Sequence, residues 1–143
     1  MMAQLAVEGS KDPSVRRQAR LLTQHLRQKD FAGEAKACFE FVRDEIRYLK
    51  DIASVETLHH AGTMLEMRAG DCDDKAILLA AMLASIGHQL QFIACAFVPG
   101  QFAHVWTRDY IGARWVDMEP TEPIGFGARM PETPGMTYLT QAL

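Results

Sequence analysis

The sequence predicts an α+β fold, in which N-terminal helices and a buried central helix pack on an antiparallel sheet of three or more strands. Apolar residues recur at helical spacing in the first part of the chain. A helix that is apolar nearly all round is expected from about Cys72 to Ile86, which places it at the centre of the fold. Strand patterns and a hairpin follow this helix between Gln89 and Met118.

Two helices are expected before the central one. The first covers residues 14–28, where Pro13 marks its start and apolar residues lie three or four positions apart. The second covers residues 32–48, with apolar side chains on one face. Between it and the central helix, residues 63–68 form either a helical turn or an ordered loop.

The strands are expected in the second half of the chain. Residues 89–98 are apolar on both faces, which indicates an interior strand ended by Pro99-Gly100. Residues 103–110 and 113–118 are expected to pair as a β-hairpin around Ile111-Gly112. The later segment is rich in proline and glycine, and one short element is expected near Tyr138.

Composition restricts the class of protein. A chain of 143 residues with 48% apolar content can build one domain with a real core. The net charge of −3 and the scattered basic residues argue against a nucleic-acid partner. No run of about 18 apolar residues is present, so no membrane partner is expected.

Cysteine usage predicts a reducing, cytoplasmic location. The N-terminal residues lack the layout of a signal peptide. Cys38, Cys72 and Cys95 are odd in number and widely spaced, which does not indicate a disulfide framework. Cys38 and Cys95 lie in apolar patterns and are expected to be buried, inert thiols.

Cys72 differs because Gly70 and Asp71 place it at the start of the central helix. Asp71 is a good N-cap, and the first-turn N–H groups and helix dipole favour a thiolate there. Asp73 and Asp74 act in the opposite sense, since nearby carboxylates raise the pKa of a thiol. A neighbouring imidazolium would favour the thiolate, so Cys72 is predicted to be the reactive thiol if a histidine lies beside it.

The hairpin brings a histidine and a carboxylate together. A two-residue turn at Ile111-Gly112 places His104 opposite Glu119, whereas a four-residue loop places it opposite Asp117. Both acids share the strand face that His104 uses in either register. An imidazole beside a carboxylate, and a cysteine within reach, is the arrangement of nucleophilic catalysis.

These residues resemble motifs of the transglutaminase-like superfamily, a circularly rearranged relative of papain-type cysteine hydrolases. The family has Gly-x-Cys at a buried helix start, His-x-Trp on a strand, and Trp-x-x-x-Asp-Pro-Thr on the next strand. The corresponding segments here are 70–72, 104–106 and 115–121, and Glu119 stands where the family has aspartate. The resemblance runs from about Phe41 to Thr121. With the length of the chain and its Pro- and Gly-rich end, it predicts one transglutaminase-like domain over residues 1–143, with its core at about 32–121 and an extended C-terminal segment at 122–143.

The resemblance also implies acyl transfer at an amide bond of a protein or peptide. Cys72 would attack the carbonyl, His104 would carry the proton, and Glu119 or Asp117 would orient the imidazole. Water as acceptor gives a protease or amidase, and an amine gives a transglutaminase. The alternative is a non-catalytic structural or peptide-binding module. Small free-standing domains of this kind are similar to bacterial and bacteriophage proteins, where an assembly or processing role is plausible.

A metal site is the chemical alternative to a triad. Cys72, His104 and Asp117 could ligate zinc, together with the histidines at His59-His60. No Cys-x-x-Cys or His-Glu-x-x-His spacing is present, so no metal or other cofactor is expected. The sequence makes no prediction of oligomeric state.

Overall fold

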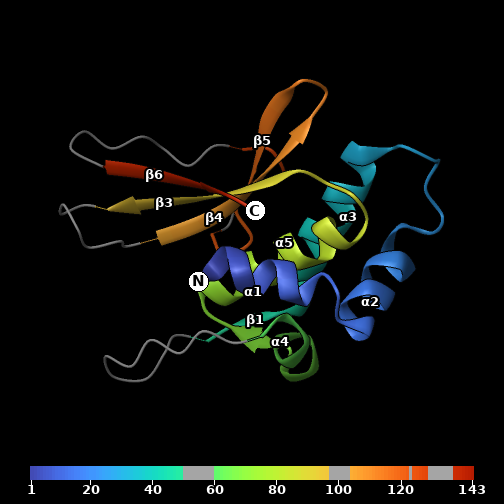
Figure 1. Ribbon diagram of the computed structural model, residues 1–143, viewed down its shortest axis with the longest axis horizontal. Coiled ribbons are helices and arrows are strands. Elements are labelled where there is room, and N and C mark those ends of the chain that lie inside the picture. The colour runs from blue at the N-terminus through green and yellow to red at the C-terminus, as the bar shows by residue number, and fades with distance from the viewer. Residues whose placement is uncertain (50–59, 97–103, 123, 129–136) are drawn as a thin grey trace.

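Helix α5, Cys72–Ser85, is the centre of the fold, and the other helices and the sheet pack around it (Figure 1). The computed structural model describes residues 1–49, 60–96, 104–122, 124–128 and 137–143. The other helices in this part of the chain are α1 Met2–Gly9, α2 Pro13–Thr23, α3 Phe31–Glu45 and α4 Ala61–Met67. The strands are β1 Arg47–Tyr48, β2 Ala69–Gly70, β3 Leu90–Ala96, β4 His104–Ile111, β5 Arg114–Met118 and β6 Thr137–Ala142.

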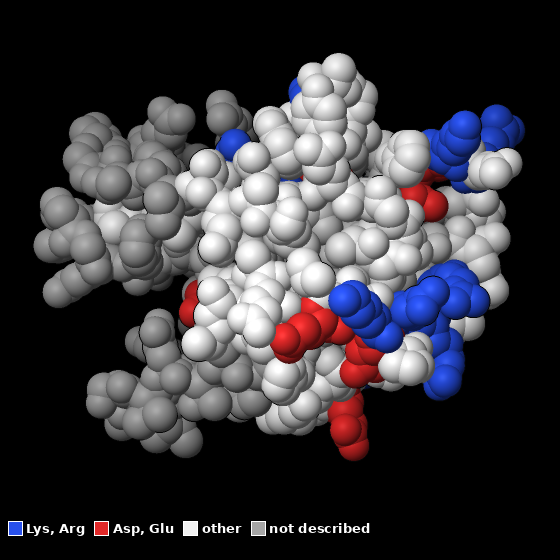
Figure 2. Space-filling view, viewed as in Figure 1, with Lys and Arg blue, Asp and Glu red and all other residues white. Residues whose placement is uncertain are grey.

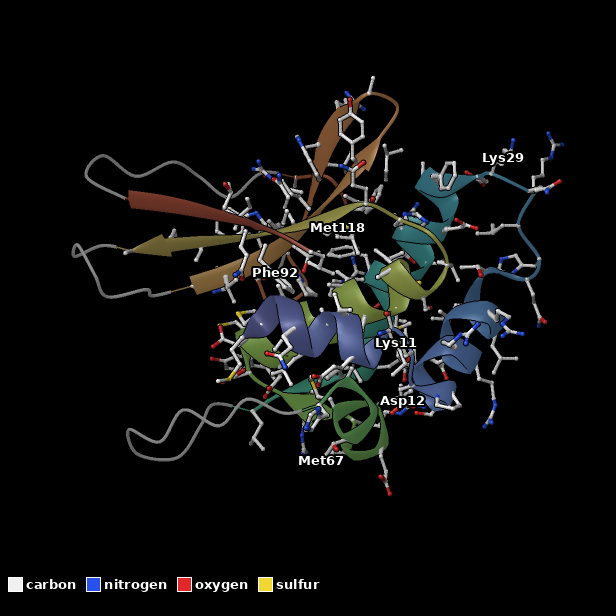
Figure 3. The ribbon with its side chains drawn as sticks, viewed as in Figure 1. Lys11, Asp12, Lys29, Met67, Phe92 and Met118 are labelled. Atoms are coloured by element: carbon white, nitrogen blue, oxygen red, sulfur yellow. The ribbon has the colours of Figure 1, made fainter. Side chains whose placement is uncertain are left out.

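The predicted α+β class is confirmed. Strands β5, β4, β3 and β6 lie in that order in an antiparallel sheet of four strands. One face of the sheet packs on α5, and Thr107 Oγ1 on β4 donates a hydrogen bond of 3.1 Å to the Ala76 carbonyl of α5. Phe92 and Met118 belong to the buried core, and Figure 3 labels both close to the crossing of the strands above α1 and α5.

Helix α5 begins at Cys72 because the residues before it form a complete cap. The Asp71 carboxylate accepts a hydrogen bond from the Asp74 backbone N–H at 3.0 Å, and the Asp74 carboxylate accepts one from the Asp71 backbone N–H at 3.3 Å. A Cβ at Gly70 would lie 2.7 Å from the Asp74 Cβ, so glycine is required at this close approach. Gly87 ends the helical region with a φ of 95°.

The earlier helices differ from the prediction at their ends. Helix α2 stops at Thr23 instead of residue 28, because the chain needs a turn before Asp30 caps α3 through the Gly33 N–H at 2.9 Å. Helix α3 stops at Glu45, and the two residues of β1 pair in parallel with β2. This pairing holds the segment that leads directly into Cys72. Of the two alternatives for residues 63–68, the helical one is present as part of α4, and α1 was not predicted.

The hairpin register differs from both predicted registers. Ile111 pairs with Arg114, so the turn consists of Gly112 and Ala113, with φ values of 60° and 63°. A two-residue turn of this kind needs positive φ at both positions, and the β-branched Ile111 is unsuited to that conformation. The turn therefore moves one residue along the chain. Pro99-Gly100, expected to end β3, lies outside the described residues.

Basic side chains gather on one part of the surface, although they are scattered along the sequence. Figure 2 shows Lys and Arg atoms gathered on the side where Figure 1 places α2. Arg16, Arg17 and Arg20 line a shallow hollow of about 380 Å³ there. Among the described helices, none is both long enough and apolar enough to cross a membrane.

A buried histidine joins three elements at the far end of α5. His88, with 1% of its side chain exposed, contacts Asp109 of β4 through Nδ1 and Glu34 of α3 through Nε2, the latter at 2.8 Å. Burial alone would lower the pKa of His88, but the two carboxylates raise it above the ordinary value. An imidazolium can donate to both acids, whereas a neutral ring can donate to only one.

We expect His88→Gln to destabilise the protein by about 2–4 kcal/mol below pH ~6.5, with a smaller loss at alkaline pH. The folded-state pKa of His88 is raised, so its stabilisation is complete below the unfolded value and declines as pH rises through the folded value. Denaturant titrations of the wild type and the variant from pH 5 to 9 measure this difference. If the free energies of unfolding of the two proteins differed by the same amount at every pH, His88 would not stabilise the fold as an imidazolium.

Candidate functional site

The Cys72 side chain lies where the N-terminus of α5 meets the first residues of β4. The thiol donates to Asp73 Oδ1 at 3.5 Å and approaches the backbone of Val105, the residue after His104. The described residues show no hydrogen bond between Cys72 and His104, so the two side chains belong to adjoining segments without being joined in this state. Cys72 is partly exposed, whereas Cys38 and Cys95 are buried as predicted.

The resting form of Cys72 is the thiol, so the carboxylate effect expected from the sequence, together with burial, outweighs the effect of the helix terminus. Burial, followed by the charge of Asp73, raises the pKa of Cys72 to about 12. The Val105 backbone acts in the opposite sense, but it does not outweigh them. The position at a helix N-terminus is therefore insufficient for activation, and a base is needed to remove the proton during attack.

His104 is held by Glu119. Its Nε2 hydrogen-bonds to Glu119 Oε2, and the Glu119 side chain is completely buried. The other carboxylate oxygen accepts hydrogen bonds from the backbone N–H groups of Thr121 at 2.8 Å and Glu122 at 3.3 Å. Since the carboxylate is fixed by the chain that follows it, it also fixes the orientation of the imidazole.

The hairpin register explains why the longer acid makes this contact. Extending the β4–β5 ladder by one pair places residue 119 opposite Trp106, so Glu119 reaches His104 diagonally. Asp117 lies directly opposite Arg108, and Arg108 Nε donates to its Oδ1 at 3.0 Å. The hydrogen bond predicted between His104 and one of the two acids is therefore present, and it involves Glu119.

The His104 imidazole is 14% exposed and lies in a field of carboxylates. Burial alone would lower its pKa, but the hydrogen bond and charge of Glu119, followed by Glu122 and Asp73, raise the pKa above the ordinary value. No described residue hydrogen-bonds to Nδ1. That nitrogen can therefore receive a proton once Nε2 is committed to Glu119.

The metal alternative has no support in the described residues, where no group of three or more His, Cys, Asp or Glu could hold an ion. Asp117 is paired with Arg108, and His60 lies before α4. His59 is outside the described residues. Sequence reasoning did not single out Lys75 or the partners of His88, because their proximity depends on packing between distant elements.

Cys72 is expected to be the first thiol to react with iodoacetamide. Exposure decides the order, because the pKa values of Cys38 and Cys72 are both raised to about 12. Its labelling should increase steadily from pH 7 to 10, without a plateau in mildly acidic solution. Peptide mapping after brief labelling measures this; faster labelling of Cys38 or Cys95 would show that the N-terminus of α5 is closed.

A buried helix that begins at a cysteine, beside an antiparallel sheet with a histidine–carboxylate pair, defines a cysteine hydrolase or acyltransferase fold. The chain belongs to the transglutaminase-like superfamily, whose sequence profile matches residues 16–120. No curated protein matched in the sequence comparison.

Two solved structures share the fold. A candidate cysteine protease from Cytophaga hutchinsonii superposes with a TM-score of 0.62 at 16% identity, over 91% of this chain and 48% of that one. A candidate protease from Parabacteroides distasonis gives a TM-score of 0.65 at 14% identity, over 82% of this chain and 25% of that one. This chain thus spans about half of the first protein and a quarter of the second.

Proposed function

We propose that this protein transfers an acyl group from an amide bond of a protein or peptide, with Cys72 as nucleophile. The hydrogen bond between His104 and the buried Glu119 carries the proposal, because it orients a partly exposed imidazole on the strand whose backbone the Cys72 sulfur approaches. The partly exposed cysteine at the N-terminus of α5 supplies the second component. Membership of the superfamily and the two fold relatives, which are a candidate cysteine protease and a candidate protease, support the same class of chemistry.

In the proposed first step, His104 Nδ1 takes the proton of Cys72 as the sulfur attacks the carbonyl carbon. Glu119 retains its hydrogen bond to Nε2–H and stabilises the positive imidazolium that forms. The backbone N–H of Cys72 is the first of α5 and has no carbonyl partner within the helix, so it can donate to the oxyanion. Since the resting thiol has a raised pKa, this proton transfer accompanies attack instead of preceding it.

Collapse of the tetrahedral intermediate then breaks the carbon–nitrogen bond. The imidazolium returns its proton to the leaving amine, and a thioester on Cys72 remains. An acceptor, water or a primary amine, attacks the thioester while His104 takes its proton. Release of the product returns that proton to the Cys72 sulfur and restores the starting state.

The test is incubation with casein and a fluorescent alkylamine, with Cys72→Ala as the control. Peptide fragments identified by mass spectrometry would establish hydrolysis, and fluorescent casein would establish amine transfer. Either product should disappear in the control. If wild type and control both yield neither product from casein, nor release p-nitrophenolate from the activated ester p-nitrophenyl acetate beyond background, the non-catalytic module is the correct reading.

A further inference from the structure

Lys75 is a buried cation that the proposed reaction does not yet use. It lies on α5 one turn after Cys72, with 2% exposure, and its Nζ donates to the Arg43 carbonyl of α3 at 3.4 Å. A buried ammonium is costly unless negative groups surround it. Burial lowers the pKa of Lys75, while the nearby charges of Glu119 and Asp44 act in the opposite sense.

Glu119 is a buried carboxylate and needs positive groups around it, as Lys75 needs negative ones. Its carboxylate is completely buried, and its contacts are hydrogen-bond donors with no full charge as long as His104 is neutral. The residues just after Glu119 and the last turn of α3 around Arg43 line one hollow of about 560 Å³. Lys75 contacts the α3 side of this region, and Glu119 is bound to the loop on the other side.

The other positive side chains near Lys75 and Glu119 are bound to other carboxylates and do not neutralise the charge of Glu119. Arg43 forms a two-point contact with Asp44, and Arg108 is bound to Asp117. Apart from Glu119, the groups in the described part of the chain whose charges act on His104 are the acids Glu122 and Asp73. The Cys95 thiol lies within the influence of Glu119 but carries no positive charge. Among the described residues, Lys75 is the buried cation, and the charge of Glu119 acts on it.

We propose that Lys75 is a positioning residue of the candidate site, which holds Glu119 as a carboxylate and so keeps the single proton of neutral His104 on Nε2. The importance of Lys75 for catalysis rests on the proposed function, but its effect on the protonation of His104 and Glu119 does not depend on activity. A carboxylic acid at Glu119 would compete for the role of donor toward Nε2 and leave Nδ1 carrying the proton. His104 would then be unable to accept the thiol proton at the nitrogen that remains available.

The consequence for titration has a definite sign. His104 and Glu119 are hydrogen-bonded, so they take up a proton as a coupled pair. Removing a neighbouring positive charge makes this uptake easier wherever the proton resides. Replacing Lys75 by a neutral side chain must therefore raise the pH at which the pair becomes protonated.

The experiment is an NMR titration of the histidine ring signals in the full-length protein, with His104 assigned by its loss in His104→Gln. In Lys75→Met, the midpoint of His104 should rise by at least about half a pH unit. Lys75→Arg keeps the charge and should stay close to wild type. Lys36→Met removes an exposed lysine of α3 and serves as the matched control. Should Lys75→Met fail to fold, Lys75→Gln keeps a donor for Arg43 and provides the same test.

An unchanged midpoint in the neutral variant, or an equal shift in Lys75→Arg, would overturn the proposal. The acylation rate with p-nitrophenyl acetate provides the second readout, and its acidic limb should shift by the same amount. If the NMR midpoint shifts but the wild type shows no acylation, Lys75 controls the pair and the proposed function fails instead. A purely structural lysine would alter the melting temperature while leaving both midpoints in place.

Discussion

Cys72→Ala is expected to eliminate the burst of p-nitrophenolate that wild-type protein releases from p-nitrophenyl acetate, with a fall in acylation rate of roughly 10⁴-fold or more. The reason is that no other described thiol combines exposure with a neighbouring base. Cys38 lies on the buried face of α3 within the core, and Cys95 belongs to a small apolar cluster with Ile93 and Trp106. Stopped-flow absorbance in the first turnover measures the burst directly.

The matched controls are Cys38→Ala and Cys95→Ala, which remove thiols of the same chemistry. Both should keep a full burst, with Cys38→Ala losing some stability because it leaves a small cavity in the core. A burst that survives in Cys72→Ala, or one lost in Cys95→Ala with the fold intact, would place the nucleophile elsewhere. Lysine or histidine acylation by the ester appears equally in all variants and can be subtracted.

The elements around Cys72 were predictable because local rules specify them. Asp71 and Asp74, three positions apart in the chain, form a complete capping box, and the apolar residues after them leave no solvent face. The same applies to the hairpin, in which strand alternation decides which side chains share a face. These features depend on residues within a few positions of each other.

The exact register could not be obtained in the same way. The expected turn was Ile111-Gly112 and the observed turn is Gly112-Ala113, a difference of one residue. Nothing in the sequence indicates that an alanine will adopt a positive φ. The face of the strand survives such a shift of two in register, which is why His104 and Glu119 still meet. The prediction that His104 shares a strand face with both acids therefore did not depend on the exact register.

The electrostatics of the site were the least predictable part. The helix terminus suggested a thiolate at Cys72, but burial of the sulfur depends on packing against β4 and cannot be judged from residues 70–75. The contacts of His88 with Glu34 and Asp109 span three elements that are far apart in sequence. A pair such as Lys75 and Glu119 is likewise created only when α5 and the chain after β5 pack together.

Glu119→Gln is expected to reduce the rate of Cys72 acylation roughly 10³-fold, whereas Asp117→Asn should change it by less than about threefold. Glutamine keeps the size of Glu119 and can still accept from the Thr121 N–H through its carbonyl oxygen. It cannot stabilise an imidazolium at His104 by charge, and its amide group can present a donor to Nε2 and select the wrong tautomer. Asp117 is bound to Arg108, so we expect no such role for it.

The pH dependence separates this explanation from simple loss of structure. Glu119 is the main group that raises the pKa of His104 against the effect of burial, so Glu119→Gln should move the acidic limb of the acylation profile to lower pH even as the maximum falls. Asp117→Asn should leave the limb in place. First-turnover rates from pH 5 to 9, with circular dichroism of each variant, measure both effects. The reverse order, with Asp117→Asn the slower variant, would mean that His104 changes its partner from Glu119 to Asp117 when substrate binds.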